Sequence, residues 1–357
     1  MTNIIQNTFT LDYPHPANRI DLYDFLRGMA MMLVVMQHAD LPGGVYITAF
    51  HMPLFFFLSG LVSGGKEQPE FCRFVSNKFK RLMVPYLIFG VLVVLMWYVI
   101  EAALHYPYDV PMALLGILSG QYGFVPEAHS GIFWFLYVIF MAELLVYPVR
   151  KVFRGSNVAK WGGVILFVLL SYGSNHWFTI SIFMLDKAFM AAAFILLGSL
   201  MKPVKEYLSD GEYRWVEVIA IIGACGGVWI SVAMNNQIVY MYLNQYGNYI
   251  WFFLGSFCGI VATLFTGKYL YRWISKNRTI VYKIIMWVGF NTLVLYPVHL
   301  IVKSVAISTP IYEHYILTCP VTVSFVLFAV LLFPSIPVCN IIVNYFPWML
   351  GMRKNKY

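Results

Sequence analysis

Residues Arg27 to His38 read RGMAMMLVVMQH, an almost wholly apolar stretch with a guanidinium at one end and an imidazole at the other. The two polar residues lie eleven positions apart. On an α-helix this spacing is three turns plus about 20°, so both side chains share one face, ~16 Å apart along the axis. Because an Arg and a His are costly in lipid, we expect this face to line a continuous polar passage that the rest of the chain encloses.

The composition is that of a polytopic membrane protein. Of the 357 residues, 60% are hydrophobic and 11% are charged, and the mean hydropathy is +0.71. A soluble protein has about 25% charged residues. Residues 1–20 are polar and lack the apolar core of a cleavable signal, so we expect the first span to act as an uncleaved anchor. The expected organisation is a cytoplasmic segment at 1–21, a membrane domain at 22–342 and a cytoplasmic tail at 343–357.

Apolar runs of the length needed to cross ~30 Å of hydrocarbon predict an all-α fold. We expect about ten transmembrane helices, at residues 22–41, 46–65, 83–104, 131–149, 161–178, 188–201, 215–234, 250–267, 284–306 and 319–342. Basic residues fall in alternate loops, and all of the 24 except Lys187 and Lys303 lie on one side of this topology. This bias predicts that both termini are cytoplasmic.

The same bias accounts for the net charge of +8. It provides a cytoplasmic surface suited to a polyanionic ligand, and we do not expect a nucleic-acid partner. The five cysteines lack the spacing of metal ligands, and four of them lie in or beside apolar runs. They are therefore interpreted as small buried hydrophobic residues, and no metal site is expected.

Polar residues inside the predicted spans are few. Each one alone has a structural explanation: a histidine can be a packing residue, a carboxylate can be paired, and Arg27 can extend to the membrane interface. Together they are too many to place in lipid unless they share a polar cavity. Neutral imidazoles in such a cavity suit proton transfer. The set comprises Asp24, Arg27, Gln37, His38, His51, Ser59, Glu101, Trp134, Glu143, Asn291, Tyr296 and His299.

Several motifs resemble those of the membrane-bound acyltransferase-3 family. They read YDFLRGMAMMLVVMQH in the first span, FHMPLFFFLSG in the second, KRLMVPYL before the third, WFL in the fourth and YPVHL in the ninth. The resemblance covers residues 19–303 and implies about ten helices. It implies that the Arg and His of the family motif are Arg27 and His38, with Asp24 as the acidic residue before them and Arg81 as the Arg at the start of the third span. Some members have a His before the Trp of the fourth span, whereas residues 130–133 here read SGIF and include no histidine.

The resemblance implies an O-acyltransferase that moves an acyl group, acetyl by default, from cytoplasmic acetyl-CoA to a hydroxyl of an extracytoplasmic or lipid-linked glycan. We expect it to be a stand-alone enzyme of the bacterial inner membrane, and its oligomeric state is left open, with a dimer as one option. The main alternative is a proton-coupled transporter or exporter of small molecules or glycan pieces. A non-catalytic membrane sensor is a third. No inverted repeat is visible, which favours the enzyme.

In this hypothesis Arg27 lies at the inner mouth of the passage and His38 lies midway. His38 is the general base, or it accepts the acyl group as an acyl-imidazole, and Ser59 or another polar group orients it. Acetyl-CoA phosphates are expected to pair with Arg27, Lys78, Lys80 and Arg81. Asp24 is expected to hold Arg27, and Glu143 to be a second base or an orienter. The acceptor is expected to contact His51, Ser59, Trp134, Asn291 and His299.

Overall fold

The computed structural model describes residues 10–11, 20–64, 67–103, 109–120, 134–153, 156–177, 182–209, 214–309, 312 and 319–352. These residues are mainly helical, and their one β-type pairing is a single bridge between Tyr240 and Gln245. The predicted all-α class is therefore confirmed for the described chain. Residues 130–133, where the fourth-span motif departs from the family pattern, lie outside it.

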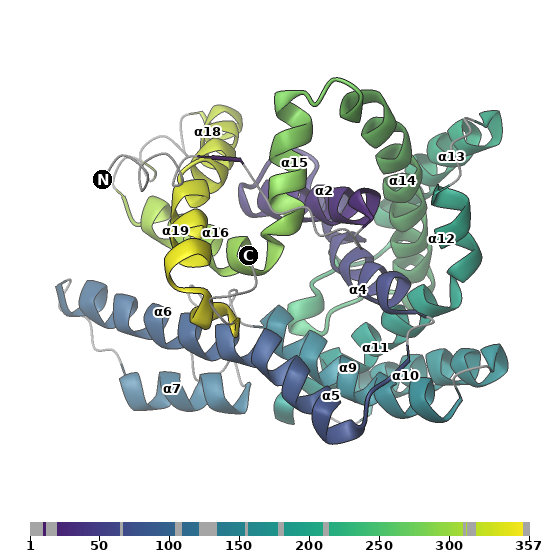
Figure 1. Ribbon diagram of the computed structural model, residues 1–357, viewed down its shortest axis with the longest axis horizontal. Coiled ribbons are helices and arrows are strands. Elements are labelled where there is room, and N and C mark those ends of the chain that lie inside the picture. The colour runs from purple at the N-terminus through teal and green to yellow at the C-terminus, as the bar shows by residue number, and fades with distance from the viewer. Residues whose placement is uncertain are drawn as a thin grey trace.

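Sixteen α-helices form the described structure. In chain order they are α2 Asp21–His38, α3 Gly44–Thr48, α4 His51–Ser63, α5 Phe71–Lys78, α6 Val84–Ala103, α7 Val110–Ser119, α9 Trp134–Val152, α10 Asn157–His176, α11 Leu185–Leu200, α12 Lys202–Ser209, α13 Trp215–Met234, α14 Tyr249–Ser275, α15 Ile280–Phe290, α16 Thr292–Ile307, α18 Pro320–Leu332 and α19 Ser335–Tyr345. Figure 1 shows α2 in the middle, with α16, α18 and α19 to one side and α12, α13 and α14 to the other.

Each of the ten predicted runs contains at least one of these helices. Five helical stretches are long and apolar enough to cross a membrane, namely Gly44–Ser63, Phe71–Ile100, Trp215–Met234, Tyr249–Ser275 and Pro320–Tyr345, and the bent pair α15 and α16 would make a sixth. Helix α2 is long enough but carries Asp21, Asp24 and Arg27. The chain is thus an integral membrane protein, while the number of ten spans and the cytoplasmic termini stay predictions.

Helix α2 packs in the interior because its neighbours approach it closely. It contacts α4, α14, α15, α16 and α18. A methyl group at Gly28 of α2 would overlap the Ile285 carbonyl of α15, and one at Gly289 would overlap the Asp24 carbonyl. Glycines at such crossings let two backbones meet, which is a common way to pack membrane helices. The same device joins α4 to α11 through Gly60 and Gly198.

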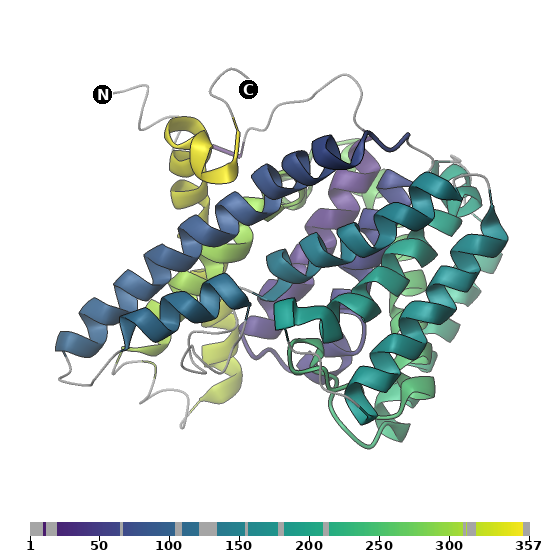
Figure 2. The same ribbon diagram turned by 90° about the horizontal axis from the view of Figure 1, so that it is seen from below.

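The outer helices present apolar side chains outward. Only 22% of the α13 span is buried within the protein, and its exposed residues include Trp215, Val216, Ile219, Ile222 and Trp229. Helix α10 likewise exposes Ile165, Leu166 and Leu169. Figure 2 shows the teal helices of this part of the chain along one side of the molecule and the long blue α6, with α7 beside it, along the other. Apolar surfaces of this extent fit lipid rather than water.

The expectation of one continuous helix at 284–306 is wrong. The chain breaks at Asn291, and α15 and α16 meet at 97°. Polar side chains at the break add hydrogen bonds to its carbonyls: Thr292 Oγ1 donates to the Val288 carbonyl at 2.9 Å, and Asn291 Nδ2 donates at 3.0 Å to the Trp287 carbonyl, which also accepts from the Asn291 N–H. Such local bonds offer the backbone an alternative to the helix.

Candidate active site

One face of α2 lines two cavities in succession. Arg27, Met31 and Val34 line the first, and Val34 and His38 line the second. Their spacings of four, three and four residues place all four side chains on one helical stripe. The polar residues at its two ends therefore face interior space rather than lipid.

The first cavity, here called the arginine chamber, has a volume of about 290 Å³. It lies between α2, α4, α5, α9 and the α15–α16 break, and much of its wall is apolar. Its polar lining consists of three cations, four hydroxyl groups and one carboxylate: Arg27, Lys78, Arg81, Ser59, Ser63, Thr292, Tyr296 and Glu143.

Glu143 is the centre of an ion-pair network in this chamber. Its carboxylate is 3.0 Å from Lys78 Nζ and 3.3 Å from Arg150 Nη1, and it accepts a hydrogen bond from Ser59 Oγ at 3.1 Å. The Glu143 side chain is only 1% exposed, whereas that of Lys78 is 28% exposed. Because two cations share one buried carboxylate, the network has a net positive charge. The ion pair with Glu143 also holds the Lys78 ammonium group at the chamber wall.

Arg27 and Arg81 add to this charge. Arg27 Nη1 pairs with Asp24 Oδ1 at 3.2 Å, one turn back on α2, as expected for a carboxylate that holds the guanidinium in place. Arg81 lies on a π-helical turn, Phe79–Met83, that joins α5 to α6. Pro85 has no N–H to close an α-helical bond to the Arg81 carbonyl, which favours this wider turn. Lys80, on the same turn, is exposed and does not line the chamber.

The second cavity, here called the histidine chamber, has a volume of about 300 Å³. It lies between the ends of α2, α4 and α16 and the segment between α13 and α14. Its polar lining consists of Gln37, His38, Thr48, His51, Trp134, Tyr240, Tyr242, Tyr296, Lys303 and Ser304.

Two imidazoles, those of His38 and His51, line this chamber, and the buried His299 lies beside His38 without lining it. The rings of His38 and His299 lie 5.4 Å apart. Nδ1 of His51 is 2.8 Å from the Ile47 carbonyl, and Nδ1 of His299 is 2.9 Å from the Leu295 carbonyl. Since a carbonyl only accepts, both Nδ1 atoms carry the proton and both Nε2 atoms are bases. Within the described chain no group of three His, Cys, Asp or Glu residues is placed to hold a metal ion.

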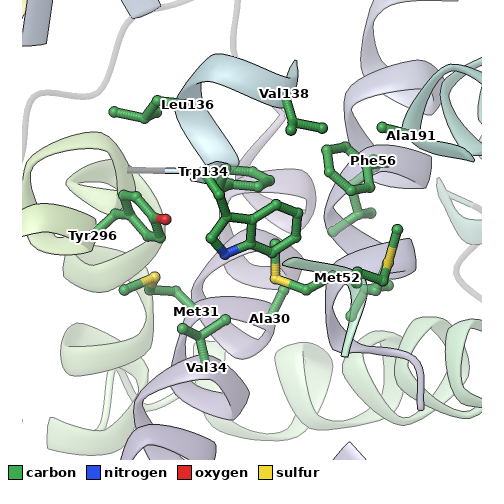
Figure 3. Close-up of a cluster of buried hydrophobic side chains, with 14 of the residues drawn as sticks. Ala30, Met31, Val34, Met52, Phe56, Trp134, Leu136, Val138, Ala191 and Tyr296 are labelled. Atoms are coloured by element: carbon green, nitrogen blue, oxygen red, sulfur yellow. The ribbon is translucent and has the colours of Figure 1, made fainter. Parts of the chain in front are cut away.

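An apolar wall separates the two chambers. Val34, Met52 and Tyr296 line both of them. Figure 3 shows the Trp134 indole surrounded by Met31, Val34, Met52 and Tyr296, with Phe56 behind. Where the sequence predicts one continuous polar passage, the structure has two cavities in succession that share the lining residues Val34, Met52 and Tyr296. The polar ends of the α2 stripe line separate cavities, because the residues between them are Met31 and Val34, whose side chains pack against the wall.

Three of the expected site residues lie elsewhere than predicted. His299 was expected to contact the acceptor, but it is buried and lines neither chamber. Ser59 lines the arginine chamber and donates to Glu143, so it does not orient His38. Asn291 was expected beside the acceptor, but it lines neither chamber, and its neighbours Phe290 and Thr292 line the arginine chamber. Eight-residue spacing on one helix predicts a shared face but not the neighbour that packs against it. For Asn291, the bend between α15 and α16 also redirects the chain.

Three residues of the site were not assigned to it from the sequence. Arg150 completes the Glu143 network from one end of α9, Lys303 lines the histidine chamber, and Tyr296 lines both chambers. Lys303 carried a usable signal, because it follows His299 by four residues and so lies on the same helical face. The positions of Arg150 and Tyr296 depend on helix packing that no local pattern specifies.

Comparison with known proteins identifies the family. The chain is 30% identical over 160 residues to nodulation protein NolL of Sinorhizobium fredii, a region that is 40% of this chain and 39% of that protein. The match therefore spans less than half the length of this relative. No solved structure matches the chain. Residues 20–344 match the acyltransferase domain that defines the acyltransferase-3 family. A match over this share of the sequence shows that the chain belongs to the acyltransferase-3 family.

Proposed function

We propose that this membrane acyltransferase transfers an acetyl group from cytoplasmic acetyl-CoA to a hydroxyl group of a glycan on the other side of the bacterial inner membrane. The observation that carries the proposal is the pair of chambers on one face of α2. One is lined by cations and the other by imidazoles, and they share a thin wall of Val34, Met52 and Tyr296.

The arginine chamber is the proposed donor site. Arg27, Lys78 and Arg81 present cations to one cavity, and guanidinium and ammonium groups bind phosphate oxygens through charge-assisted hydrogen bonds. Lys80 is exposed beside them and would meet the outermost phosphate. Asp24 and Glu143 act here as positioning residues, since each holds a cation at a fixed distance.

The apolar residues between the two chambers can contact the uncharged part of acetyl-CoA. A pantetheine arm and an acetyl group carry little charge, so Met31, Val34 and Met52 can contact them without leaving a charge unpaired. For transfer to occur, the wall must part enough to let the thioester meet a group in the histidine chamber.

The histidine chamber is the proposed acceptor site. His38 takes the proton of the acceptor hydroxyl, the oxygen forms a bond to the thioester carbon, and the C–S bond breaks to release coenzyme A as the thiol. The alternative route, in which the acetyl group first bonds to His38 and is then passed to the hydroxyl, uses the same residues. His51 and Trp134 line this space and would contact the sugar, while His299 lies behind, beside the His38 ring.

The test is acetyl-CoA consumption by the full chain in lipid nanodiscs. Thiol release from acetyl-CoA, measured with and without a panel of methyl glycosides, should be lost in His38→Ala. The matched control is His176→Ala, because His176 is exposed on α10 and lines neither chamber. Thiol release that persists in folded His38→Ala removes His38 from the chemistry. If the wild-type protein binds acetyl-CoA but releases no thiol, the proposed enzymatic function is contradicted and the transporter alternative is favoured.

A further inference from the structure

Tyr296 occupies the boundary between the two chambers. Of the three residues that line both, Val34 and Met52 are apolar, and Tyr296 alone has a polar side chain. It comes from α16, just after the bend, and its ring lies 5.4 Å from that of Phe135 and 6.2 Å from that of His299. Figure 3 shows the Tyr296 ring facing Trp134 across the wall.

The hydroxyl group of Tyr296 is buried and has no hydrogen-bond partner among the described residues. The Phe135 backbone interacts with it electrostatically but makes no hydrogen bond of acceptable geometry with it. An unpaired buried hydroxyl is unfavourable, and in native proteins such a group is exceptional and needs an explanation. Its position on the wall points to a partner that arrives with the substrate.

The imidazoles of His51 and His299 do not take this part. His51 and His299 use their Nδ1 protons on backbone carbonyls, so the Nε2 atom of each is an acceptor. A carbonyl oxygen that becomes negative needs a donor, and hydrogen-bond donors fixed at that position are a large source of rate enhancement.

We propose that Tyr296 is a catalytic residue whose hydroxyl donates a hydrogen bond to the carbonyl oxygen of the donor thioester. This inference depends on the proposed acetyl transfer. As the acceptor oxygen bonds to the carbonyl carbon, the π-electron pair of the carbonyl moves onto its oxygen, where the Tyr296 O–H meets it. When the C–S bond breaks, the carbonyl re-forms, the thiolate receives the proton held by His38, and Tyr296 keeps its own proton throughout.

The test variant is Tyr296→Phe, which removes the hydroxyl and keeps the ring. We expect kcat for thiol release to fall by about 100-fold, the typical effect of losing one such donor, while KM for acetyl-CoA changes by less than about two-fold because the phosphate contacts remain. The melting temperature should stay level or rise, since an unpaired buried hydroxyl is removed. A purely structural tyrosine would show the opposite pattern, with lower stability and unchanged kcat.

The matched control is Tyr246→Phe. Tyr246 is also fully buried, its hydroxyl also lacks a geometric hydrogen-bond partner among the described residues, and it lines neither chamber. Its loss should leave kcat unchanged. A kcat for folded Tyr296→Phe within two-fold of wild type overturns the inference. Absence of thiol release in the wild type overturns the proposed function itself, so the two failures are distinct.

A spectroscopic measurement gives a second reading. With ¹³C-labelled acetyl-CoA bound to His38→Ala, which cannot turn over, the carbonyl stretch should lie at lower frequency than in His38→Ala/Tyr296→Phe. Equal frequencies contradict the hydrogen bond. If the double variant does not fold, incorporation of 3-fluorotyrosine at position 296 replaces it, because a more acidic hydroxyl should lower the carbonyl frequency further, and an unchanged frequency again overturns the inference.

Discussion

The substitution Glu143→Gln tests the ion-pair network of the arginine chamber. It keeps the size of the side chain but removes the charge shared by Lys78 and Arg150. Lys78 is 28% exposed and can turn toward solvent, but Arg150 is 6% exposed, and its Nε and Nη2 atoms already lack hydrogen-bond partners in the described chain. The main cost is therefore one buried, uncompensated guanidinium.

Breaking a buried ion pair by removing one partner costs about 3–5 kcal/mol. Because the side-chain amide oxygen introduced by Glu143→Gln can still accept one hydrogen bond, we expect the lower end, ~3 kcal/mol of unfolding free energy. SDS titration of the purified protein in mixed micelles measures it. Glu70→Gln, at an exposed carboxylate, is the control and should change stability by less than ~0.5 kcal/mol.

Two further results decide whether this account of Glu143 is right. The double variant Glu143→Gln/Arg150→Met should recover at least about half of the unfolding free energy lost in Glu143→Gln, because it also removes the buried, unpaired guanidinium. Per folded molecule, Glu143→Gln should raise KM for acetyl-CoA and keep kcat within about three-fold of wild type, because Glu143 positions Lys78 for binding of the donor. A stability loss below ~1 kcal/mol refutes the electrostatic reasoning, and a kcat loss above about 100-fold would identify Glu143 as a base.

Three other predictions follow from the same structure. Arg27→Gln should raise KM for acetyl-CoA by roughly 10- to 100-fold, since a charge-assisted bond contributes ~1.5–3 kcal/mol; unchanged donor affinity in a binding assay would remove Arg27 from the phosphate site. Lys268→Met leaves Glu217 buried without its ion-pair partner, so unfolding free energy should drop by ~3 kcal/mol, while KM of the folded fraction stays constant. Gly198→Leu should abolish folded yield in size-exclusion profiles, because its side chain would strike the Phe57 carbonyl, whereas Gly226→Leu, which meets no atom within 4 Å, should express normally.

Much of the site was predictable from local patterns. The eleven-residue spacing on α2 placed Arg27 and His38 on one face, and both line interior cavities. Asp24 was expected to hold Arg27, and the two are paired at 3.2 Å. These features follow from helical periodicity, which the order of residues specifies completely once a helix forms.

The partners of those residues were not predictable. Glu143 meets Lys78 and Arg150, and Ser59 donates to it rather than to His38, because α4, α5 and α9 converge there. Contacts between distant segments depend on helix crossings, and here glycines such as Gly28 and Gly60 determine how closely the backbones approach.

The sequence by itself determined the helical membrane class, the polar stripe of α2 and the family, because hydropathy, periodicity and motif order are properties of single segments. Only the tertiary structure decided that the stripe lines two chambers instead of one passage, and that Tyr296 lies at their boundary. The physical reason is that a cavity is the space left between several helices. Its continuity depends on side chains such as Met52 and Trp134 that reach it from separate segments, and on the 97° bend that brings α16 against them.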